Sequence, residues 1–369
     1  MKFSCEKTLL QSAITTASRA IPNKSTIPAL EGLLLQANHH LTVSGYNMQT
    51  GIRTTINANI IEPGTLVLNA RLFGDIIRKL PDDILTFTSD TKMNVTLTCG
   101  DTFFEIQAVS AEDYPDLPEV EDQYSVTVQQ NTLRAMISQT AFAVSTMETR
   151  PIHTGSLFEI TENGLTIVSV DGFRLALRRE KLEKFEGGAF HFVAPGAALN
   201  EVEKICNDSD ENAVITLGNR HLLFEVGQTQ LICRRLEGEF LDYKAAIPRS
   251  NPITLTLEKR GMINSIDRVS VVISEKQKSP VRCVFDENKV FMSTKTANGE
   301  AKDICRVNGD GKKLEIGFNH RYLMEALKYA PADEVKMELN TGISPCIIVP
   351  TEGEENFLYM VLPVRLKNS

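Results

Sequence analysis

The stretch GTLVLNARLFGDIIRKLP, from Gly64 to Pro81, decides the fold because the chain repeats its pattern. Its first residues predict a strand that ends near Leu68, and Asn69–Ala70 then form a turn into a helix. Apolar residues at helical spacing would share one face of that helix: Leu72, Phe73, Ile76, Ile77 and Leu80. The unit is therefore one strand followed by one amphipathic helix.

The same pattern returns twice, at shifts of 125 and 250 residues. All ten positions that correspond to Leu68, Leu72, Phe73, Ile77 and Leu80 are apolar or aromatic. They are Val193, Ala197, Ala198, Val202, Ile205, Phe318, Tyr322, Leu323, Leu327 and Ala330. A period of this length is too long for a solenoid repeat and fits a whole small domain.

Each third of the chain also opens with a strand and a helix and continues with a hairpin. The predicted openings are 1–3 with 7–20, 124–128 with 131–145, and 253–257 with 258–270. In the first of these helices the apolar stripe would be Leu9, Ala13, Ala17 and Ala20. The predicted hairpins are 32–36 with 41–44, 157–160 with 165–168, and 282–285 with 290–293. Asn163–Gly164 is a strong hairpin signal in the second of them.

Two connectors separate the thirds. In both connectors, Ala111–Val120 and Gly238–Pro248, an aromatic residue lies near an aspartate. Both also contain proline, which predicts that they are extended linkers. We place domain boundaries near residues 122 and 250, which gives domains 1–122, 123–250 and 251–369. Each would hold about seven short strands and two helices in an α+β arrangement.

Bulk properties agree with an ordinary globular protein. The 369 residues predict two or three domains at about 150 residues each. We expect a soluble, cytoplasmic chain, because it shows neither a leader pattern nor a run of about 18 apolar residues. The seven cysteines are scattered and form no C-x-x-C pair, which favours buried free thiols over a disulfide framework or a zinc site.

The charges are distributed unevenly between helices and the rest of the chain. The six predicted helices hold twelve basic and six acidic residues, a sum of +6, whereas the whole chain carries −8 and the remainder therefore −14. If the helices share one surface, that surface is basic and suits a phosphate backbone. The helices show neither interleaved aromatic residues nor a recognition-helix cluster, so we expect contact with duplex DNA backbone without sequence readout.

Catalytic and metal-binding motifs are not found. The sequence contains no G-x-x-x-x-G-K-[ST], no G-x-S-x-G and no H-x-x-x-H pair, and no cofactor or metal is expected. Asp171–Gly172 is interpreted as a turn between strands. The apolar run Phe357–Leu366 predicts a strand that Pro363 stops. The residues beyond Pro363 either pack on another surface or line an exposed groove.

Several segments together resemble the bacterial DNA polymerase III beta-subunit family, the sliding clamps, from the first residue to the last. They are Met1–Phe3, Lys24–Pro28, Asn69–Arg71 with Asp75, Val170–Ala176, Gly317–Asn319 with Tyr322–Leu323, and Met360–Leu366. The resemblance implies a head-to-tail homodimer of three-domain subunits that closes into a ring. Two helices per domain would line the hole around double-stranded DNA, with antiparallel sheets outside. It also implies a non-catalytic processivity factor.

In such a clamp the polymerase catalytic subunit, clamp-loader subunits and repair proteins bind through short clamp-motif peptides in a hydrophobic pocket. The resemblance carries that pocket over to His153, Val170, Gly172, Phe173, Arg174, Leu175, Leu241, Ala245, Ala246, Asn319, Tyr322, Met360, Val361, Leu362, Pro363, Val364 and Arg365. His153, Phe173, Leu241 and Ala245 depart from the residues that are frequent in the family. DNA contacts carry over to Lys24 and Arg150, with Arg71, Arg78 and Lys79 as further candidates. The dimer interface carries over to Phe104 and Ile106, facing Val272 and Ile273.

Two other classes of function stay open at this point. A symmetric scaffold with another cargo would share the repeat. A nucleic-acid enzyme could assemble a site from dispersed carboxylates such as Asp171.

Overall fold

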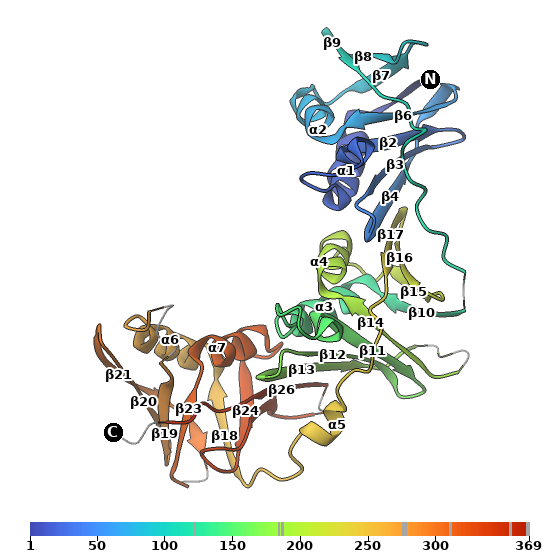
Figure 1. The fold of residues 1–369 in the computed structure, drawn as a ribbon. Coiled ribbons are helices and arrows are strands. Elements are labelled where there is room, and N and C mark those ends of the chain that lie inside the picture. The colour runs from blue at the N-terminus through green and yellow to red at the C-terminus, as the bar shows by residue number, and fades with distance from the viewer. Residues whose placement is uncertain are drawn as a thin grey trace. The chain divides into compact units, whose positions relative to one another are not determined.

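The computed structural model describes residues 1–121, 123–183, 185, 188–274, 279–309, 312–353 and 356–366. The chain divides into two compact units. Unit 1 contains residues 1–134 and 197–235, and unit 2 contains residues 135–196 and 236–369. Figure 1 shows the elements of both along the chain.

Unit 1 is built on two antiparallel sheets. The first has the order β5 (Asn59–Glu62), β1 (Lys2–Glu6), β7 (Ile84–Ser89), β8 (Asn94–Cys99) and β9 (Thr102–Gln107). The second has the order β10 (Tyr124–Gln129), β15 (Asn212–Leu217), β16 (His221–Val226), β17 (Thr229–Arg234), β4 (Thr50–Ile56), β3 (Leu41–Tyr46), β2 (Gly32–Ala37) and β6 (Gly64–Asn69). β17 pairs with β4, so this sheet joins strands of the first and second thirds.

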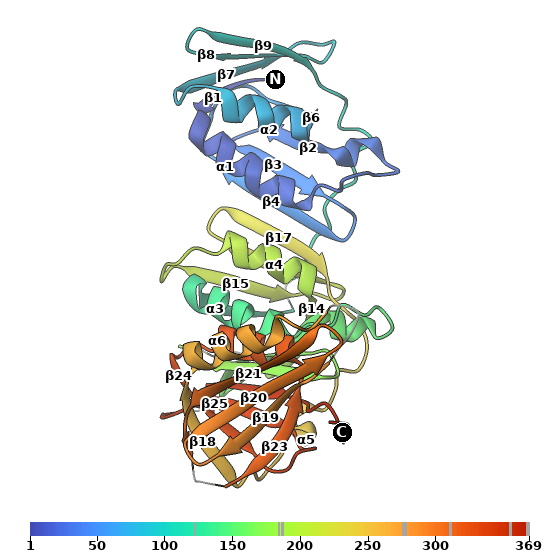
Figure 2. The same cartoon turned by 90° about the vertical axis from the view of Figure 1, so that its left-hand side faces the viewer.

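Helices α1 (Lys7–Ala17) and α2 (Ala70–Lys79) pack against each other in unit 1, as Figure 2 shows, and α4 (Gly196–Ile205) belongs to this unit from Ala197 on. The strand–turn–helix prediction for Gly64–Pro81 is confirmed: β6 ends at Asn69, whose side-chain oxygen accepts a hydrogen bond from the Leu72 backbone N–H at 2.9 Å. Phe73, Ile76 and Ile77 are buried, as expected.

Two residues of the predicted apolar stripes lie elsewhere. Leu72 is 49 % exposed because it precedes Phe73 by one residue, which turns its side chain about 100° around the helix axis. Leu9 is exposed for the same reason, and Leu10 and Ile14 take its place in the core beside Ala13 and Ala17.

Unit 2 also contains two antiparallel sheets. The larger has the order β14 (Phe190–Pro195), β11 (Gly155–Thr161), β12 (Gly164–Val170), β13 (Arg174–Glu180), β26 (Phe357–Val361), β25 (Cys346–Pro350), β24 (Glu334–Leu339), β18 (Ile253–Glu258) and β22 (Asn308–Gly309). The smaller has the order β21 (Gly299–Arg306), β20 (Lys289–Thr296), β19 (Val281–Asp286) and β23 (Leu314–Phe318). The pairing of β13 with β26 joins the second and third thirds. Helices α6 (Lys259–Ser270) and α7 (His320–Tyr329) lie side by side in this unit.

The remaining helices correct the sequence prediction. α3 (Gln130–Ala141) has residues in both units and ends four residues before the expected Ser145. The Thr140 hydroxyl and the Thr140 backbone carbonyl both make hydrogen bonds in the tighter turn that ends this helix. α5 (Tyr243–Ala246) lies in a connector that was predicted to be extended, and Asp242 caps it. The first third holds β1 to β9, more strands than the expected seven. Short 3-10 helices cover Ser18–Ala20, Pro28–Glu31 and Pro151–Thr154.

The internal repeat is visible in backbone hydrogen bonds at the edge strands β6, β14 and β23. The fourth residue of each strand, Val67, Val193 or Gly317, accepts a bond from Val109, Leu236 or Val364, at 2.9, 2.9 and 2.8 Å. The tail after Pro363 is therefore the third copy of a segment that continues into a connector in the first two copies.

Each unit has its own hydrophobic core. Phe3, Phe73 and Phe87 are fully buried in unit 1, and Phe318, Leu323 and Tyr359 in unit 2. All seven cysteines are free and buried, which confirms that prediction. Burial raises the pKa of the Cys233 and Cys283 thiols to about 12. Among the residues that the structure describes, no helix is long and apolar enough to cross a membrane.

Candidate functional site

The turn between β12 and β13 is fixed by its own side chain. The Asp171 carboxylate accepts hydrogen bonds from the backbone N–H groups of Phe173 at 2.9 Å and Arg174 at 3.1 Å. Gly172 between them has φ +89°, a conformation that favours glycine. The turn therefore presents Phe173, whose side chain is 53 % exposed, at its tip.

Arg174 holds this turn against two other elements of unit 2. Its guanidinium side chain is only 10 % exposed, and Nε donates to the Asp171 carboxylate at 2.8 Å. The other nitrogens donate to Glu325 in α7 and to the Phe142 carbonyl, the latter at 2.5 Å. The group also lies over the rings of Tyr322 and Phe142, 4.6 and 5.4 Å from their centroids. An arginine that donates to three different acceptors and stacks on two rings is held in one position.

The C-terminal tail runs along the same turn. The Leu362 N–H donates to the Phe173 carbonyl at 2.9 Å, and the Val364 N–H donates to the Gly317 carbonyl at 2.8 Å. A side chain at Gly317 would meet the tail, because a Cβ there would lie 2.6 Å from the Val364 carbonyl oxygen. Glycine at this position thus allows the tail to lie against β23.

These elements enclose a cleft of about 530 Å³ within unit 2. Phe173 and Tyr322 form a stacked pair in its wall, with ring centroids 6.0 Å apart. The lining residues are Phe173, Ile273, Ser274, Ser279, Asn319, His320, Arg321, Tyr322, Leu362, Pro363 and Val364. Size and lining fit a pocket for apolar side chains with a few polar groups. Of the residues beyond Pro363, Val364 lines this groove, whereas Leu366 lies close to Gly317 of β23, so both alternatives left by the sequence occur in the tail.

Burial shifts the pKa values of two side chains of the cleft, Tyr322 and His320, in the direction that favours their neutral forms. It raises the pKa of the Tyr322 hydroxyl, to which the nearby Asp171 charge also contributes. Burial lowers the pKa of His320, and the charge of Arg321 lowers it further. At pH 7 both side chains are therefore uncharged.

The structure brings together six of the predicted pocket residues in this cleft: Phe173, Asn319, Tyr322, Leu362, Pro363 and Val364. Three more, Val170, Leu175 and Met360, belong to an adjoining buried apolar cluster, against which Leu362 also packs. His153 is buried, with its ring 5.5 Å from that of Phe240, and burial lowers its pKa. Val361 lies in the main core of unit 2.

The other predicted pocket residues do not line the cleft. Gly172 and Arg174 shape it from the turn, as described above. Leu241, Ala245, Ala246 and Arg365 are exposed. From the same connector Phe240, Tyr243 and Ile247 pack into the apolar cluster instead. The aromatic residues at 240 and 243 are a feature of the sequence from which this packing could have been predicted. No pattern in the sequence indicates that five other residues line the cleft: Ile273, Ser274, Ser279, His320 and Arg321.

The five predicted DNA-contact residues, Lys24, Arg71, Arg78, Lys79 and Arg150, are all exposed. Arg78 pairs with Asp75 at 2.9 Å. With the observed bounds, the six longer helices hold eleven basic and five acidic residues, so their sum stays at +6. Lys7 is an exception to a basic surface, because its side chain is buried and donates to Asp82 at 2.8 Å.

Of the predicted interface residues, Phe104 and Ile106 lie on an edge strand of unit 1, whereas Val272 and Ile273 follow α6 in unit 2. In unit 1, β9 is an edge strand; Phe103 is 60 % exposed, while Phe104 and Ile106 pack partly on the core. In unit 2, β21 is an edge strand with Ile304 exposed. The Val272 carbonyl accepts a hydrogen bond from Thr296 at 2.8 Å, and Val271 beside it is exposed. Ile273 lines the cleft described above.

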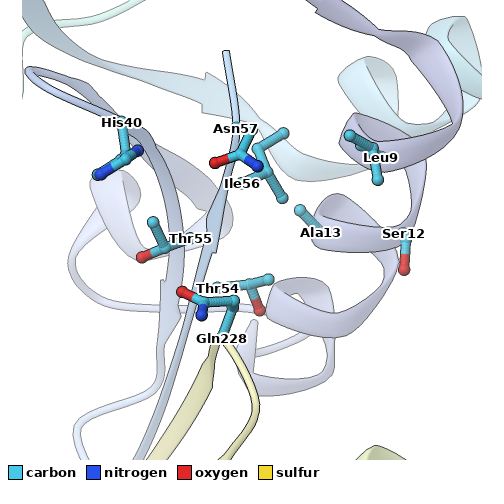
Figure 3. Close-up of a pocket in the computed structure, with 9 residues that line it drawn as sticks. All are labelled: Leu9, Ser12, Ala13, His40, Thr54, Thr55, Ile56, Asn57 and Gln228. Carbon is cyan, nitrogen blue, oxygen red and sulfur yellow. The ribbon is translucent and has the colours of Figure 1, made fainter.

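A second hollow of about 510 Å³ lies in unit 1 between α1 and β4 (Figure 3). Leu9, Ser12 and Ala13 come from α1, Thr54 to Asn57 from the β4 region, and His40 and Gln228 from two turns. Its lining is mostly neutral and shares no residue with the predicted sites.

Comparisons with known proteins cover the whole chain. Models of the N-terminal, central and C-terminal domains of the DNA polymerase III beta subunit match residues 1–118, 127–242 and 244–365. The beta sliding clamps of Staphylococcus aureus (strain Mu50) and Staphylococcus epidermidis are both 31 % identical over 376 residues, with 99 % of each chain covered. The crystal structure of the DNA polymerase sliding clamp from Bacillus subtilis has a TM-score of 0.94 at 27 % identity and full coverage of both chains. The beta subunit from Streptococcus pyogenes has a TM-score of 0.94 at 26 % identity, covering 99 % of this chain and 100 % of that one.

Proposed function

The chain belongs to the DNA polymerase III beta subunit family, and from this premise we infer how its surfaces serve a sliding clamp. It is a non-catalytic processivity factor of DNA replication, and DNA and DNA polymerase are its partners. We propose three domains with boundaries near residues 122 and 250. As a replication protein it would act in the cytoplasm.

We propose that the cleft between Phe173, Tyr322 and Leu362 binds short peptides of the polymerase catalytic subunit, the clamp loader and other partners. The observation that carries this proposal is the cleft itself: a stacked aromatic pair, held by Arg174, opens beside an apolar tail. A rigid pocket loses little entropy when a peptide binds, which favours affinity from few contacts. Desolvated aromatic side chains are the usual anchors of such interfaces.

We further propose that two copies of the chain close into a ring around duplex DNA. The edge strands β9 and β21 leave backbone N–H and C=O groups for pairing with another chain. Both edges carry exposed apolar residues, Phe103 and Ile304, which would be covered in a head-to-tail contact. The exposed Lys24, Arg71, Arg78, Lys79 and Arg150 would face phosphate groups without reading sequence.

The peptide proposal is tested with Tyr322→Ala combined with Leu362→Ala. Leu175, although predicted for the pocket, is a poorer choice because it is buried in a core cluster and its loss would cost stability. We expect the double variant to bind a polymerase-derived peptide about 30-fold more weakly, which corresponds to about 2 kcal/mol. An unchanged affinity in fluorescence anisotropy would reject the pocket.

The ring proposal is tested on circular DNA. A clamp loaded on nicked circular DNA should stay bound through gel filtration at high salt and should leave once the DNA is cut to a linear form. Retention on the linear form, or loss from the circle, contradicts topological binding. Sedimentation across concentrations must also show a dimer, because a single copy cannot close the ring.

Asp171 offers little support for a nucleic-acid enzyme. Both of its oxygens already accept hydrogen bonds, from Arg174 Nε and from two backbone N–H groups. Its side chain is nearly buried beneath the turn. The carboxylate therefore shapes the cleft.

A further inference from the structure

The sequence contains three asparagines that are each followed by glycine: Asn163, Asn298 and Asn308. In such a pair the backbone nitrogen of glycine can attack the side-chain carbonyl carbon of asparagine, because glycine has no Cβ to hinder the approach. The new C–N bond closes a five-membered succinimide ring, and the Cγ–Nδ2 bond breaks with loss of ammonia. Water then opens the ring at either carbonyl and leaves aspartate or isoaspartate, so the reaction consumes water alone.

The reaction requires that the backbone around the glycine can move, and two of the three sites are fixed. Gly164 is buried, and a Cβ at that position would lie 2.1 Å from the Glu180 carbonyl oxygen, which shows how closely β13 packs against it. Asn308–Gly309 forms β22 and pairs with β18. The glycine after Asn163 and the glycine after Asn308 are therefore held by neighbouring backbone.

Asn298 lies in a more open place. It is exposed in the turn between β20 and β21, and Gly299 is exposed with it. The closest atom to a Cβ added at Gly299 would be Cγ1 of Val272, at 3.9 Å. β21 is an edge strand, so its backbone is paired on one side only. This turn therefore has the room and the freedom that ring closure needs.

The amide of Asn298 also holds a neighbouring turn. Its Nδ2 donates to the Val272 carbonyl at 3.4 Å, beside the bond that the Thr296 hydroxyl donates to the same oxygen at 2.8 Å. Val272 follows Val271, the C-cap residue of α6, where the helix presents the negative end of its dipole. A carboxylate at position 298 would replace the donor with a negative charge beside that carbonyl, which weakens the contact between the two turns.

We propose that Asn298 is a modification site, at which spontaneous loss of ammonia produces aspartate or isoaspartate and loosens the turn Val271–Ile273. Val272 and Ile273 of this turn are predicted contacts between two copies of the chain, so the modification weakens the proposed dimer. This second step rests on the proposed ring, whereas the modification itself does not. An aged chain would thus lose its partner before it loses its fold.

The modification is tested on the full chain, which is incubated in mildly alkaline buffer and then digested for peptide mass spectrometry. The peptide with Asn298 should gain the mass difference between OH and NH2 about five-fold faster than the peptides with Asn163 and Asn308, where neighbouring strands hold the glycine by hydrogen bonds. Acidic buffer should suppress the reaction, because the attacking nitrogen must lose its proton. Asn298→Gln should abolish it at this position, because glutamine would have to close a less favourable six-membered ring. Equal conversion at the three asparagines, or none at Asn298, would overturn the inference.

The consequence for the dimer is tested by sedimentation across concentrations. Asn298→Asp should raise the dissociation constant about five-fold, because it removes one hydrogen bond and places a charge at a helix end. Asn163→Asp is the matched control, because it makes the same charge change in the turn between β11 and β12, which contains no predicted interface residue.

The control should dissociate like the unchanged chain. If Asn298→Asp does so too, the second step is wrong even where the mass spectra bear out the modification. A chain that stays monomeric at every concentration refutes the proposed ring and the second step together, while the mass spectra still decide whether Asn298 is modified.

Discussion

Two turns that lie 124 residues apart share one backbone design. In the turn Tyr46–Thr50, between β3 and β4, the Asn47 side chain accepts bonds from the N–H groups of Gln49 at 3.0 Å and Thr50 at 2.7 Å. Asp171 does the same in Val170–Arg174. The middle residue of each has a positive φ, +70° at Met48 and +89° at Gly172. A strand end from the next third donates to each turn, from Arg234 to Gln49 and from Leu362 to Phe173.

The two turns differ in the side chains that they present. Where the second has Phe173 and Arg174, the first has Gln49 and Thr50. The helices differ likewise, since the position that Tyr322 takes in α7 is taken in α4 by the exposed Ala197. The two turns therefore share one backbone conformation, and the aromatic and charged side chains of the second turn form the cleft that the first turn lacks.

The largest expected difference between the turns is in stability. Asn47→Ala should cost about 1 kcal/mol, because it removes two neutral side-chain hydrogen bonds, one exposed and one partly buried. Asp171→Ala should cost about 3 kcal/mol, because it removes the two backbone bonds of the turn and also the charged hydrogen bond from the nearly buried Arg174, which keeps only Glu325 as a carboxylate partner. Urea unfolding measures both values. If both variants lose the same free energy of unfolding, the hydrogen bond between Arg174 and Asp171 contributes nothing measurable to stability.

The next comparison concerns peptide binding. Phe173→Gln, which installs the residue of the first turn, should weaken a bound peptide about 30-fold, or about 2 kcal/mol. The melting temperature should hardly change, because Phe173 is more than half exposed. Gln49→Phe is the reciprocal variant and should leave the stoichiometry at one peptide per chain, since Ala197, at the position of Tyr322, offers no ring for stacking. A second peptide in titration calorimetry would contradict this.

The middle residues of the two turns should respond in opposite directions. Met48→Gly should stabilise the protein by about 0.5 kcal/mol, because relief of the left-handed backbone exceeds the entropy that glycine loses. Gly172→Ala should destabilise it by about 1 kcal/mol through strain alone, since nothing lies within 4 Å of the added Cβ. Thermal unfolding of both variants gives the signs, and shifts in the same direction would refute the explanation.

The smallest effect concerns two 3-10 helices that precede β2 and β11. Their third residues are the buried Leu30 and the buried His153, whose pKa burial lowers. A histidine whose pKa is lower in the folded than in the unfolded chain binds protons more readily in the unfolded chain. Its protonation therefore favours unfolding, and the free energy of unfolding decreases as the pH falls below about 6.5. His153→Leu should reduce the loss of stability between about pH 7 and pH 5. His221 and His320 also have lowered pKa values, so the measurement is the difference between the two proteins.

Much of the fold could be predicted from the sequence because helices and hairpins follow local patterns. The helix after Asn69 and the hairpin 155–170 are examples. The pairing of β17 with β4 could not be predicted, since it joins residues about 180 positions apart whose alternation fits many partners. Leu72 was wrongly predicted to be buried, because an apolar residue at the margin of a helical stripe can face either the core or the solvent.

The candidate site was predicted in part, for a similar reason. The resemblance located Phe173, Tyr322 and the tail, which lie in the cleft, because those segments match the family motif directly. Ile273 and Arg321 come to the cleft through tertiary packing and no local pattern marks them. Phe240 and Tyr243 pack into the apolar cluster from a connector that was predicted to be an extended linker because it ends on Pro248.

The pairing of β17 with β4 has a consequence for how the protein survives cleavage. The Ala111–Val120 connector exposes Glu112 and Asp113, and a protease that cuts there would break the only covalent path between the first two thirds. The fragments would remain joined by the ladder from Thr229–Thr54 to Cys233–Thr50 and by Tyr114 and Leu117, which stay buried against Ile232 and Leu30. A nicked protein should thus elute as one particle, and halves expressed separately should reassemble, so this site suits a split reporter.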